Sequence, residues 1–464
     1  MAELDSLPTS ESPPAPAPAA AEPNRLSVAH HDRDAVLFVP GLGSESTQWI
    51  DQSSRSIATQ FAAALGRQNP TARFRAEANE LRQCHEVLAA EPGRPERNVL
   101  DVYVVDYHRT FVSGFESSSL LWKCLHVFVA TAGSARKFFP ALFGRSRRGK
   151  TFREKLQFAL LALLLSLSWV YLIVLGVAVA ETGWRVVGPA LQQVAGPQPD
   201  GGEPSWVGRA WDQARAVGRW LAAAATPVVV FVTAVGVMVR PRLKEEFVRM
   251  MTNYYSAYDY LTFGDGQLLV GLVAKRVQEV TAAGGYRDVH LVGYSFGCVV
   301  TLNSLFPRSA EPLPVFSRVA TLVTIGNPVD VVRTFWPRYL KSRCARPAAP
   351  RRWLNVFSMD DILSSNFGDT RSADRDPDPE VVFDIFSREP SDAPCPTGCG
   401  PGPTPENIPL PSNTDSRDFS WAETIKLYGV KAHAGYWNST RPEAPSCFDE
   451  IVRALSTGGG GGRA

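Results

Sequence analysis

The chain has 464 residues, more than a single hydrophobic core usually supports, so we expect one large domain with additional segments. Lysine and arginine (48) nearly balance aspartate and glutamate (46), which leaves a formal net charge of +2. A chain balanced in this way has no overall field that would gather nucleic acid, so we expect no nucleic-acid partner.

The seven cysteines are scattered and odd in number, which suits a reducing compartment better than a disulfide framework. Only Cys395 and Cys399 lie close together, and no second pair of ligands lies near them. Because a structural zinc ion needs four ligands, we expect plain free thiols, no metal and no cofactor.

The first 32 residues are rich in proline, alanine and serine and lack the pattern of an export signal, so we expect a disordered tail. A first domain segment follows at 33–118. Within it, Ala35 to Val39 predicts a buried strand that leads into a Gly-x-Gly turn, Gly41-Leu42-Gly43. Asn98 to Asp106 predicts a further strand.

Residues 119–250 form an insertion with two long uncharged runs. Leu156 to Ala180 is 25 residues long, enough to cross the roughly 30 Å hydrocarbon core of a bilayer as a helix. Trp220 to Val239 also has the length of a span, although Pro227 weakens it, and a buried core helix is the alternative for either run.

Basic residues flank the two runs on their outer sides. By the positive-inside rule both flanks face the cytoplasm, so we expect a two-helix transmembrane hairpin with helices at about 156–180 and 220–239. The basic residues are Arg136, Lys137, Arg145, Arg147, Arg148, Lys150, Arg153 and Lys155 before the first run, and Arg240, Arg242 and Lys244 after the second.

The second domain segment, 251–456, opens with a helix predicted from about Asp265 to Ala282. Asp288 to Val292 then predicts a buried strand, and Cys298 to Asn303 predicts the start of a helix. Ser295 lies on the turn between them.

The sequence of this turn, Gly293-Tyr294-Ser295-Phe296-Gly297, resembles the nucleophile elbow of the α/β-hydrolase family, in which a serine lies on a strained strand-to-helix turn. Gly293 and Gly297 permit a turn this tight. The resemblance implies an α/β-hydrolase-like, mostly parallel sheet with helices on both faces, interrupted here by the hairpin. A glycine-rich turn with an incidental serine is the alternative.

A serine that attacks a carbonyl group needs backbone donors for the developing oxyanion. In this family one donor is the amide that follows the nucleophile, here Phe296, and the other comes from a loop after an earlier strand. The Gly41-Leu42-Gly43 turn resembles that loop and would supply the Leu42 amide, with Pro40 in place of the family's usual histidine. An ordinary strand-to-helix turn is the alternative.

The chain order in this family is serine, acid, histidine, and His433 is the only histidine after Ser295. The resemblance therefore implies that His433 is the base, delivered by the glycine-containing segment Ala432 to Trp437. A histidine on a surface loop is the alternative.

The acid is expected at the end of a strand between these two residues. Trp353 to Met359 predicts that strand, and Asp360-Asp361 follows it directly. The resemblance to related lipases and thioesterases favours Asp361 over Asp360. Asp330, which follows the preceding strand Thr321 to Gly326, is a third candidate.

Asn366 to about Ser416 is dense in aspartate, proline, glycine and serine, which predicts a flexible excursion with only Val381 to Phe386 apolar enough for a short strand. The segment from Trp421 looks partly extended, and Phe448 to Leu455 predicts a helix. Residues 457–464 are expected to form a disordered tail. The resemblance further suggests a shortened sheet, without the family's first two strands.

Leu42 precedes both uncharged runs and Ser295 follows them, so a working site requires an even number of membrane crossings. We therefore expect a two-pass integral membrane protein with its catalytic domain and both termini in the cytoplasm. The resemblance implies a serine hydrolase of the lipase, esterase or thioesterase type, and the anchor suggests a lipid or acyl-ester substrate. The alternatives are a catalytically silent membrane adaptor and a soluble hydrolase whose apolar runs form a lid. No feature of the sequence indicates the oligomeric state.

Overall fold

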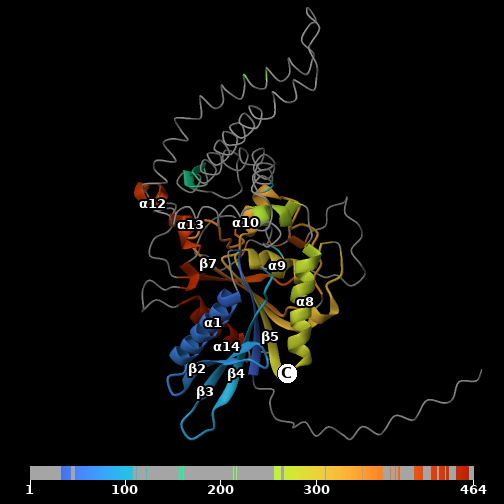
Figure 1. The fold of residues 1–464 in the computed structure, drawn as a ribbon. Coiled ribbons are helices and arrows are strands. Elements are labelled where there is room, and N and C mark those ends of the chain that lie inside the picture. Colours follow the sequence, from blue (N-terminus) through green and yellow to red (C-terminus); the bar gives the residue numbers. More distant parts are fainter. Residues whose placement is uncertain are drawn as a thin grey trace, which may run out of the picture.

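The computed structural model describes eleven stretches of the chain and a few isolated positions. The stretches are residues 33–42, 47–107, 255–262, 266–308, 310–346, 349–368, 402–410, 420–425, 428–433, 435–437 and 446–458, and the isolated positions are 111, 122, 156, 157, 159, 160, 213, 216, 377, 382, 385 and 386. The described residues form an α/β fold built on one eight-stranded sheet (Figure 1).

The sheet is mostly parallel. Its strands are β1 (Arg33–Val39), β2 (Arg73–Asn79), β3 (Cys84–Ala90), β4 (Arg97–Val104), β5 (Tyr286–Tyr294), β6 (Val319–Ile325), β7 (Arg352–Ser358) and β8 (Pro405–Leu410). Across the sheet they follow the order β2-β3-β4-β1-β5-β6-β7-β8. The six strands from β4 to β8 in this order are parallel, and β3 is antiparallel to both of its neighbours.

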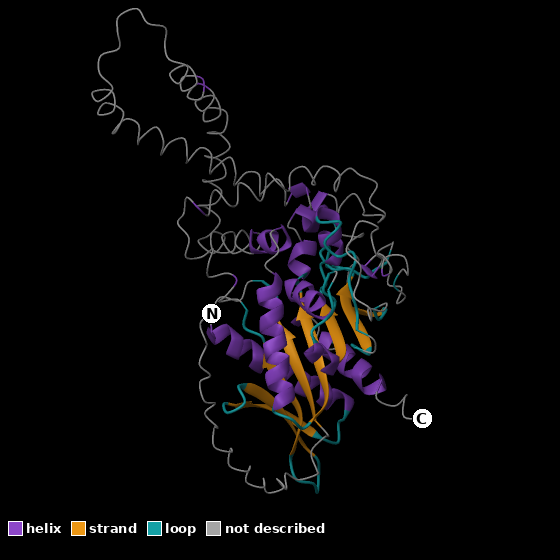
Figure 2. Cartoon of the chain, turned by 90° about the vertical axis from the view of Figure 1, so that its right-hand side faces the viewer, coloured by secondary structure: helices purple, strands orange, loops and turns teal. Residues whose placement is uncertain are grey.

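Helices cover both faces of the sheet (Figure 2). On one face, Val36 and Phe38 of β1 belong to an apolar cluster with residues of α1 and α14. On the other face, Leu37 of the same strand belongs to a second cluster with residues of α8 and α9. The helices are α1 (Thr47–Gln68), α8 (Gly266–Ala282), α9 (Phe296–Leu305), α10 (Val329–Phe335), α12 (Trp421–Ile425), α13 (Tyr428–Ala432) and α14 (Cys447–Gly458), with 3-10 turns η1 (Pro314–Arg318) and η3 (Gly435–Trp437).

The two-sided burial explains why the central strands were visible in the sequence. Every residue of β6 is buried, and β1 and β7 are buried over five of their seven residues. Strands covered on both faces are continuous apolar runs rather than alternating ones. The strands predicted around residues 35, 98, 288, 321 and 353 are confirmed, as are the helices predicted around 265, 298 and 448.

The sheet is not shortened, contrary to the expectation. The β2–β3 hairpin lies between β1 and β4 along the chain. In the sheet it extends the edge beyond β4, with β3 next to β4 and β2 outermost. The sequence prediction omitted it because the outer strand has no buried residue, so it lacks the apolar run that marked the central strands.

Three further expectations about local structure were wrong. Strand β8 lies inside the range expected to be a flexible excursion, and it pairs with β7 over six residues. Val382, Ile385 and Phe386 are helical rather than extended, at the i, i+3, i+4 spacing of one helix face, and they pack against the core. The segment from Trp421, expected to be partly extended, forms helices α12 and α13.

Among the described residues, no helix has the length and apolarity needed to cross a membrane. The two runs predicted to span the membrane lie outside the described residues, except for positions 156, 157, 159 and 160. The tails predicted at the two ends also lie outside, apart from residues 457 and 458, which end α14.

Of the described cysteines, Cys84, Cys298 and Cys447 are free and buried, whereas Cys344 is disulfide-bonded. The disulfide at Cys344 differs from the expectation that the scattered cysteines suit a reducing compartment. Its partner is not one of the other described cysteines, and both residues of the Cys-x3-Cys pair lie outside the described stretches.

Candidate active site

Ser295 is the single residue between the end of β5 and the start of α9. Its backbone angles are φ 52° and ψ −122°, close to those of the first central residue of a type II′ turn, a position that favours glycine. A serine at positive φ is uncommon and costs on the order of 1–3 kcal/mol, which the packing around it must offset. Ser295 therefore lies on a strained turn at the carboxyl end of a central strand.

Gly293 and Gly297 flank this turn at positions with no room for a side chain. A methyl group on Gly293 would lie 2.7 Å from Oγ1 of Thr301, on the next turns of α9. A methyl group on Gly297 would lie 2.1 Å from the carbonyl oxygen of Val39 and 2.5 Å from that of Pro40. The second glycine thus allows the turn to touch the end of β1.

His433 joins Ser295 to Asp361 through its two ring nitrogens. Nε2 lies 2.6 Å from Oγ of Ser295, and Nδ1 lies 2.7 Å from Oδ2 of Asp361. The Asp361 side chain is fully buried, and that of His433 is 14% exposed. Because an ionised carboxylate only accepts hydrogen bonds, Nδ1 carries the proton and Nε2 accepts the hydrogen bond of the Ser295 hydroxyl. The structure therefore brings together three residues that the sequence had singled out.

The other two candidate acids do not contact His433. Its hydrogen bonds in the described part of the chain go to Ser295, Asp361 and, through its carbonyl oxygen, to Tyr294. Asp360 is half-buried beside Asp361, and Asp330 lies in the first turn of α10. Of the three aspartates, Asp361 alone has the geometry of an acid that orients the imidazole.

Two tyrosines that the sequence analysis did not select hold this arrangement in place. The Tyr294 hydroxyl donates to the carbonyl oxygen of His433 over 2.6 Å, and the two rings stack with centroids 5.7 Å apart. The Tyr436 hydroxyl donates to Oδ2 of Asp361 over 2.9 Å. Each tyrosine lies within three residues of a predicted site residue, which was the available signal for finding them.

Gly326, at the end of β6, was also missed. Its φ is 58°, and a methyl group there would lie 2.9 Å from the Tyr436 ring and 3.2 Å from Cε1 of His433. A glycine at this position therefore leaves space for both rings.

The end of β1 lies against the serine turn. A methyl group on Gly41 would lie 3.0 Å from Cβ of Ser295, and the Tyr107 hydroxyl donates to the carbonyl oxygen of Pro40 over 2.6 Å. Leu42 follows, half-buried against the apolar core. Residues 40–42, called the oxyanion loop below, thus lie next to the nucleophile candidate, whereas Gly43 is outside the described residues.

Phe296, whose amide is the other candidate donor, is anchored by aromatic packing. Its buried ring stacks on Phe111 at 5.9 Å and meets the edge of Tyr260 at 5.1 Å. Ring contacts of this kind add specific geometry to the burial of apolar area. These two ring contacts hold the first residue of α9 in place directly after Ser295.

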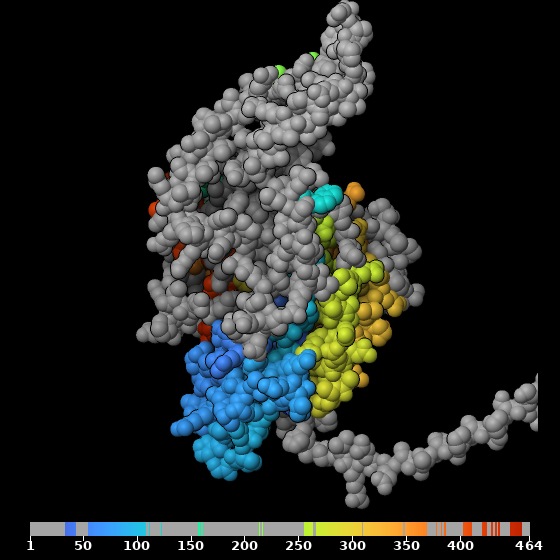
Figure 3. All heavy atoms as spheres, viewed as in Figure 1, coloured from blue at the N-terminus to red at the C-terminus, as the bar shows by residue number. Residues whose placement is uncertain are grey.

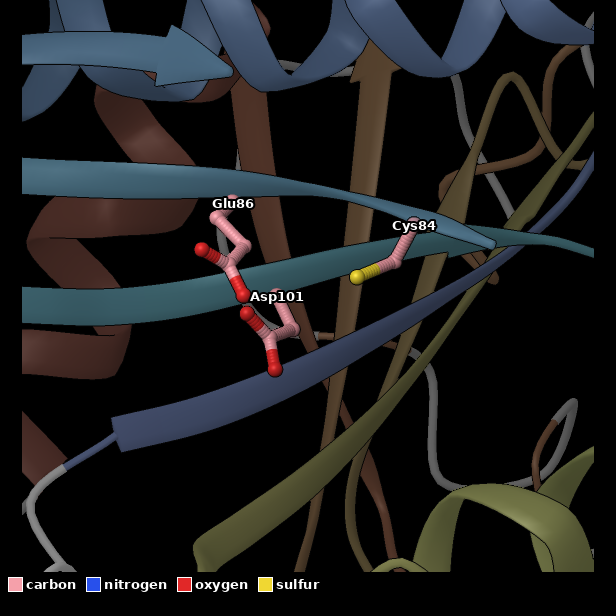
Figure 4. Close-up of side chains that lie close together, drawn as sticks. All are labelled: Cys84, Glu86 and Asp101. Carbon is pink, nitrogen blue, oxygen red and sulfur yellow. The ribbon is translucent and has the colours of Figure 1, made fainter. Parts of the chain in front are cut away.

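A separate cluster of possible metal ligands lies at the hairpin edge of the sheet. The ligand atoms of Cys84, Glu86 and Asp101 all lie within 4.8 Å of one another (Figure 4). Arg33 and Arg82 approach the buried Asp101 carboxylate at 3.7 and 3.5 Å, and burial raises the pKa of the Cys84 thiol to about 12. The two guanidinium groups already balance the charge of the Asp101 carboxylate, so we assign no metal to this cluster.

A cavity of about 570 Å³ lies between α1, the β2–β3 hairpin and α8, whose atoms adjoin in Figure 3 (blue beside yellow-green). Ser54 and His85, a buried pair joined by a 2.9 Å hydrogen bond, are among its lining residues. Ser295, Asp361 and His433 do not line it, so this cavity does not belong to the candidate active site.

No protein-family model, no curated protein and no solved structure matches the chain. The function is therefore inferred from the geometry of the site.

Proposed function

We propose that the chain is a membrane-anchored serine hydrolase of the α/β-hydrolase type, which cleaves carboxylic esters or thioesters through an acyl-enzyme. One observation carries the proposal: His433 lies within hydrogen-bond distance of both Ser295 and Asp361, with the serine on a strained turn next to the oxyanion loop. This is the arrangement of a nucleophile, a base and an orienting acid.

In the acylation half-reaction, Oγ of Ser295 attacks the substrate carbonyl carbon while Nε2 of His433 takes the hydroxyl proton. The amides of Phe296 and Leu42 stabilise the negative charge on the carbonyl oxygen. The tetrahedral intermediate then collapses, and the alcohol or thiol leaves with the proton from Nε2. Asp361 stabilises the imidazolium throughout.

In the deacylation half-reaction, a water molecule replaces the alcohol or thiol. His433 takes a proton from the water as its oxygen attacks the acyl carbon, and the same amides hold the second oxyanion. Collapse of this intermediate returns the proton to Oγ of Ser295 and releases the carboxylic acid. Water is the only co-reactant of the two half-reactions, so the proposed cycle needs no cofactor.

The proposed membrane hairpin is joined to the described domain beside the site. Before the insertion, Tyr107 bonds to the oxyanion loop, and after it Tyr260 packs against Phe296. Gln157, at the start of the first uncharged run, is fully buried and accepts the amide hydrogen bond of Gly429 in α13, the helix before His433. A hairpin anchored here would hold the site near the bilayer surface, which favours lipid or acylated substrates.

Labelling with a fluorophosphonate tests the proposed chemistry. The probe is expected to modify Ser295 because it reacts with serines that a neighbouring base activates. The intact chain should be labelled, and Ser295→Ala and His433→Ala variants of equal folded yield should not. Unchanged labelling of Ser295→Ala would contradict the proposal, and no labelling of the intact chain would favour a catalytically silent adaptor.

Alkaline extraction of membranes tests the anchor. A chain with two spanning helices should stay in the membrane pellet, because alkaline carbonate releases peripheral proteins and leaves integral ones. The control is a variant lacking residues 161–239, which keeps Gln157 and should move to the soluble fraction. Release of the intact chain would favour the soluble hydrolase with an apolar lid.

A further inference from the structure

Tyr436 lies in the 3-10 turn, three residues after His433. Its side chain is buried, and its ring packs edge-to-face against the imidazole of His433. Its hydroxyl has three partners in the site, one of which is the side chain of Ser364. It donates to Oδ2 of Asp361 over 2.9 Å and accepts the amide hydrogen of Ser358, at the end of β7, over 3.1 Å. One phenol therefore connects the histidine segment to the strand that carries the acid.

The oxygen that receives the Tyr436 hydrogen bond is the one that faces His433. Both the hydroxyl and Nδ1–H of the imidazole point to Oδ2, while Oδ1 accepts the backbone amide of Leu363 over 2.9 Å. Burial, and after it the charge of Asp361, raise the pKa of Tyr436 well above its usual range. The phenol thus stays protonated and remains a donor at every pH at which the site could work.

We propose that Tyr436 is a positioning residue of the hydrolase, whose hydroxyl aims the Asp361 carboxylate at His433 and moderates its charge. This role rests on the proposed serine-hydrolase function. A hydrogen bond from a neutral donor draws negative charge from the oxygen that it contacts. The carboxylate then orients the imidazole without holding its protonated form as strongly as an unshared carboxylate would.

The hydrogen bond from Tyr436 to Asp361 determines in which direction the pH dependence of the labelling rate should shift. His433 must be neutral to act as a base, so the acid limb of the rate profile reports its protonation. Removal of the Tyr436 hydroxyl strengthens the attraction between Asp361 and the imidazolium, which moves the limb to higher pH. The titratable side chains in contact with the Asp361–His433 pair include Tyr436 from the turn and Tyr294 from β5, and Asp360 is the chain neighbour of Asp361.

The experiment measures the second-order rate of fluorophosphonate labelling of Ser295 against pH in the full chain. In Tyr436→Phe, the acid-limb midpoint is expected to rise by about one half to one pH unit, and the plateau rate to fall about three- to tenfold, the size of one neutral hydrogen bond. Replacing Tyr436 by 3-fluorotyrosine, a stronger donor of almost equal volume, should move the midpoint to lower pH. A role in packing alone would move neither midpoint.

The matched control is Tyr103→Phe, which removes a comparable buried hydroxyl from a 2.6 Å bond to Tyr286, away from the site. Its labelling profile should keep the wild-type midpoint.

The outcomes separate the two proposals. Absence of labelling in the wild-type chain would overturn the proposed function, and this role with it. Labelling of Tyr436→Phe and of the 3-fluorotyrosine chain with the wild-type midpoint would overturn the positioning role alone.

Discussion

Asp361→Asn is expected to lower the rate of fluorophosphonate labelling of Ser295 at neutral pH by about ten-thousand-fold, the size of the effect that the wrong imidazole tautomer has in serine hydrolases with this triad. The residue is nearly isosteric, so the change replaces one acceptor oxygen by a donor group and leaves the packing intact. The loss should appear in the maximal rate, because the carboxylate orients the base and does not bind the probe.

The contacts of the carboxylate show why an amide cannot substitute for it. Oδ1 accepts the Leu363 amide, and Oδ2 accepts from His433 and Tyr436. An asparagine has a single oxygen for these two sides. If that oxygen faces Leu363, the amide nitrogen faces His433 and forces Nδ1 to accept, so Nε2 carries a proton and cannot take one from the serine.

Asp360→Asn is the matched control, since it is the same substitution one residue earlier in the chain. Asp360 is half-buried and is not a partner of His433. We expect its labelling rate to stay within about twofold of the wild type, because Asp360 does not orient the imidazole of His433. A large loss in Asp360→Asn, with near-normal labelling of Asp361→Asn, would show that the acid has been assigned to the wrong residue.

The parallel core of the sheet was predictable because its sequence signal is local. Burial on both faces makes β5, β6 and β7 mostly apolar, with few interior polar residues such as His290 and Asn355, and each strand is followed by polar or glycine residues. The candidate nucleophile and acid follow such strands, and His433 was selected because it is the only histidine after Ser295 in the chain. The pair Asp360-Asp361 could only be ranked, because which of two adjacent side chains faces the imidazole depends on the turn after β7.

The edges of the sheet were not predicted, for two different physical reasons. In β2 the apolar residues Phe74, Ala76 and Ala78 alternate with polar ones, a period-2 pattern that a search for apolar runs overlooks. Strand β8 contains Pro405 and Pro409, which normally argue against a strand. Proline is tolerated there because β8 is at the edge of the sheet and has only one neighbouring strand.

The support around the site depends on contacts between distant segments, which no local pattern encodes. Gly326, at the end of β6, leaves space for the rings of His433 and Tyr436, about one hundred residues further along the chain. Tyr436 in turn reaches Ser358 and Asp361. These residues were ordinary in the sequence and acquire a role only through the order in which β5, β6 and β7 pair.

Gly297→Ala is expected to destabilise the fold by about 3 kcal/mol and to lower the labelling rate of Ser295 by about a hundredfold. The added methyl group would lie 2.1 Å from the carbonyl oxygen of Val39 and 2.5 Å from that of Pro40. Both contacts are with backbone atoms, so no flexible side chain can move aside. Relief requires the serine turn and the oxyanion loop to separate, which moves the Leu42 amide away from the position of the substrate carbonyl oxygen.

Thermal unfolding and fluorophosphonate labelling of the same preparations measure the two effects. The control is Gly271→Ala, an exposed interior position of α8 where an added methyl group meets no atom within 4 Å. This variant should unfold at a slightly higher temperature, since alanine is preferred to glycine in a helix by about 1 kcal/mol, and should label at the wild-type rate. Wild-type stability and labelling in Gly297→Ala would mean that the serine turn does not touch the end of β1, and the oxyanion loop would then lose its place in the proposed mechanism.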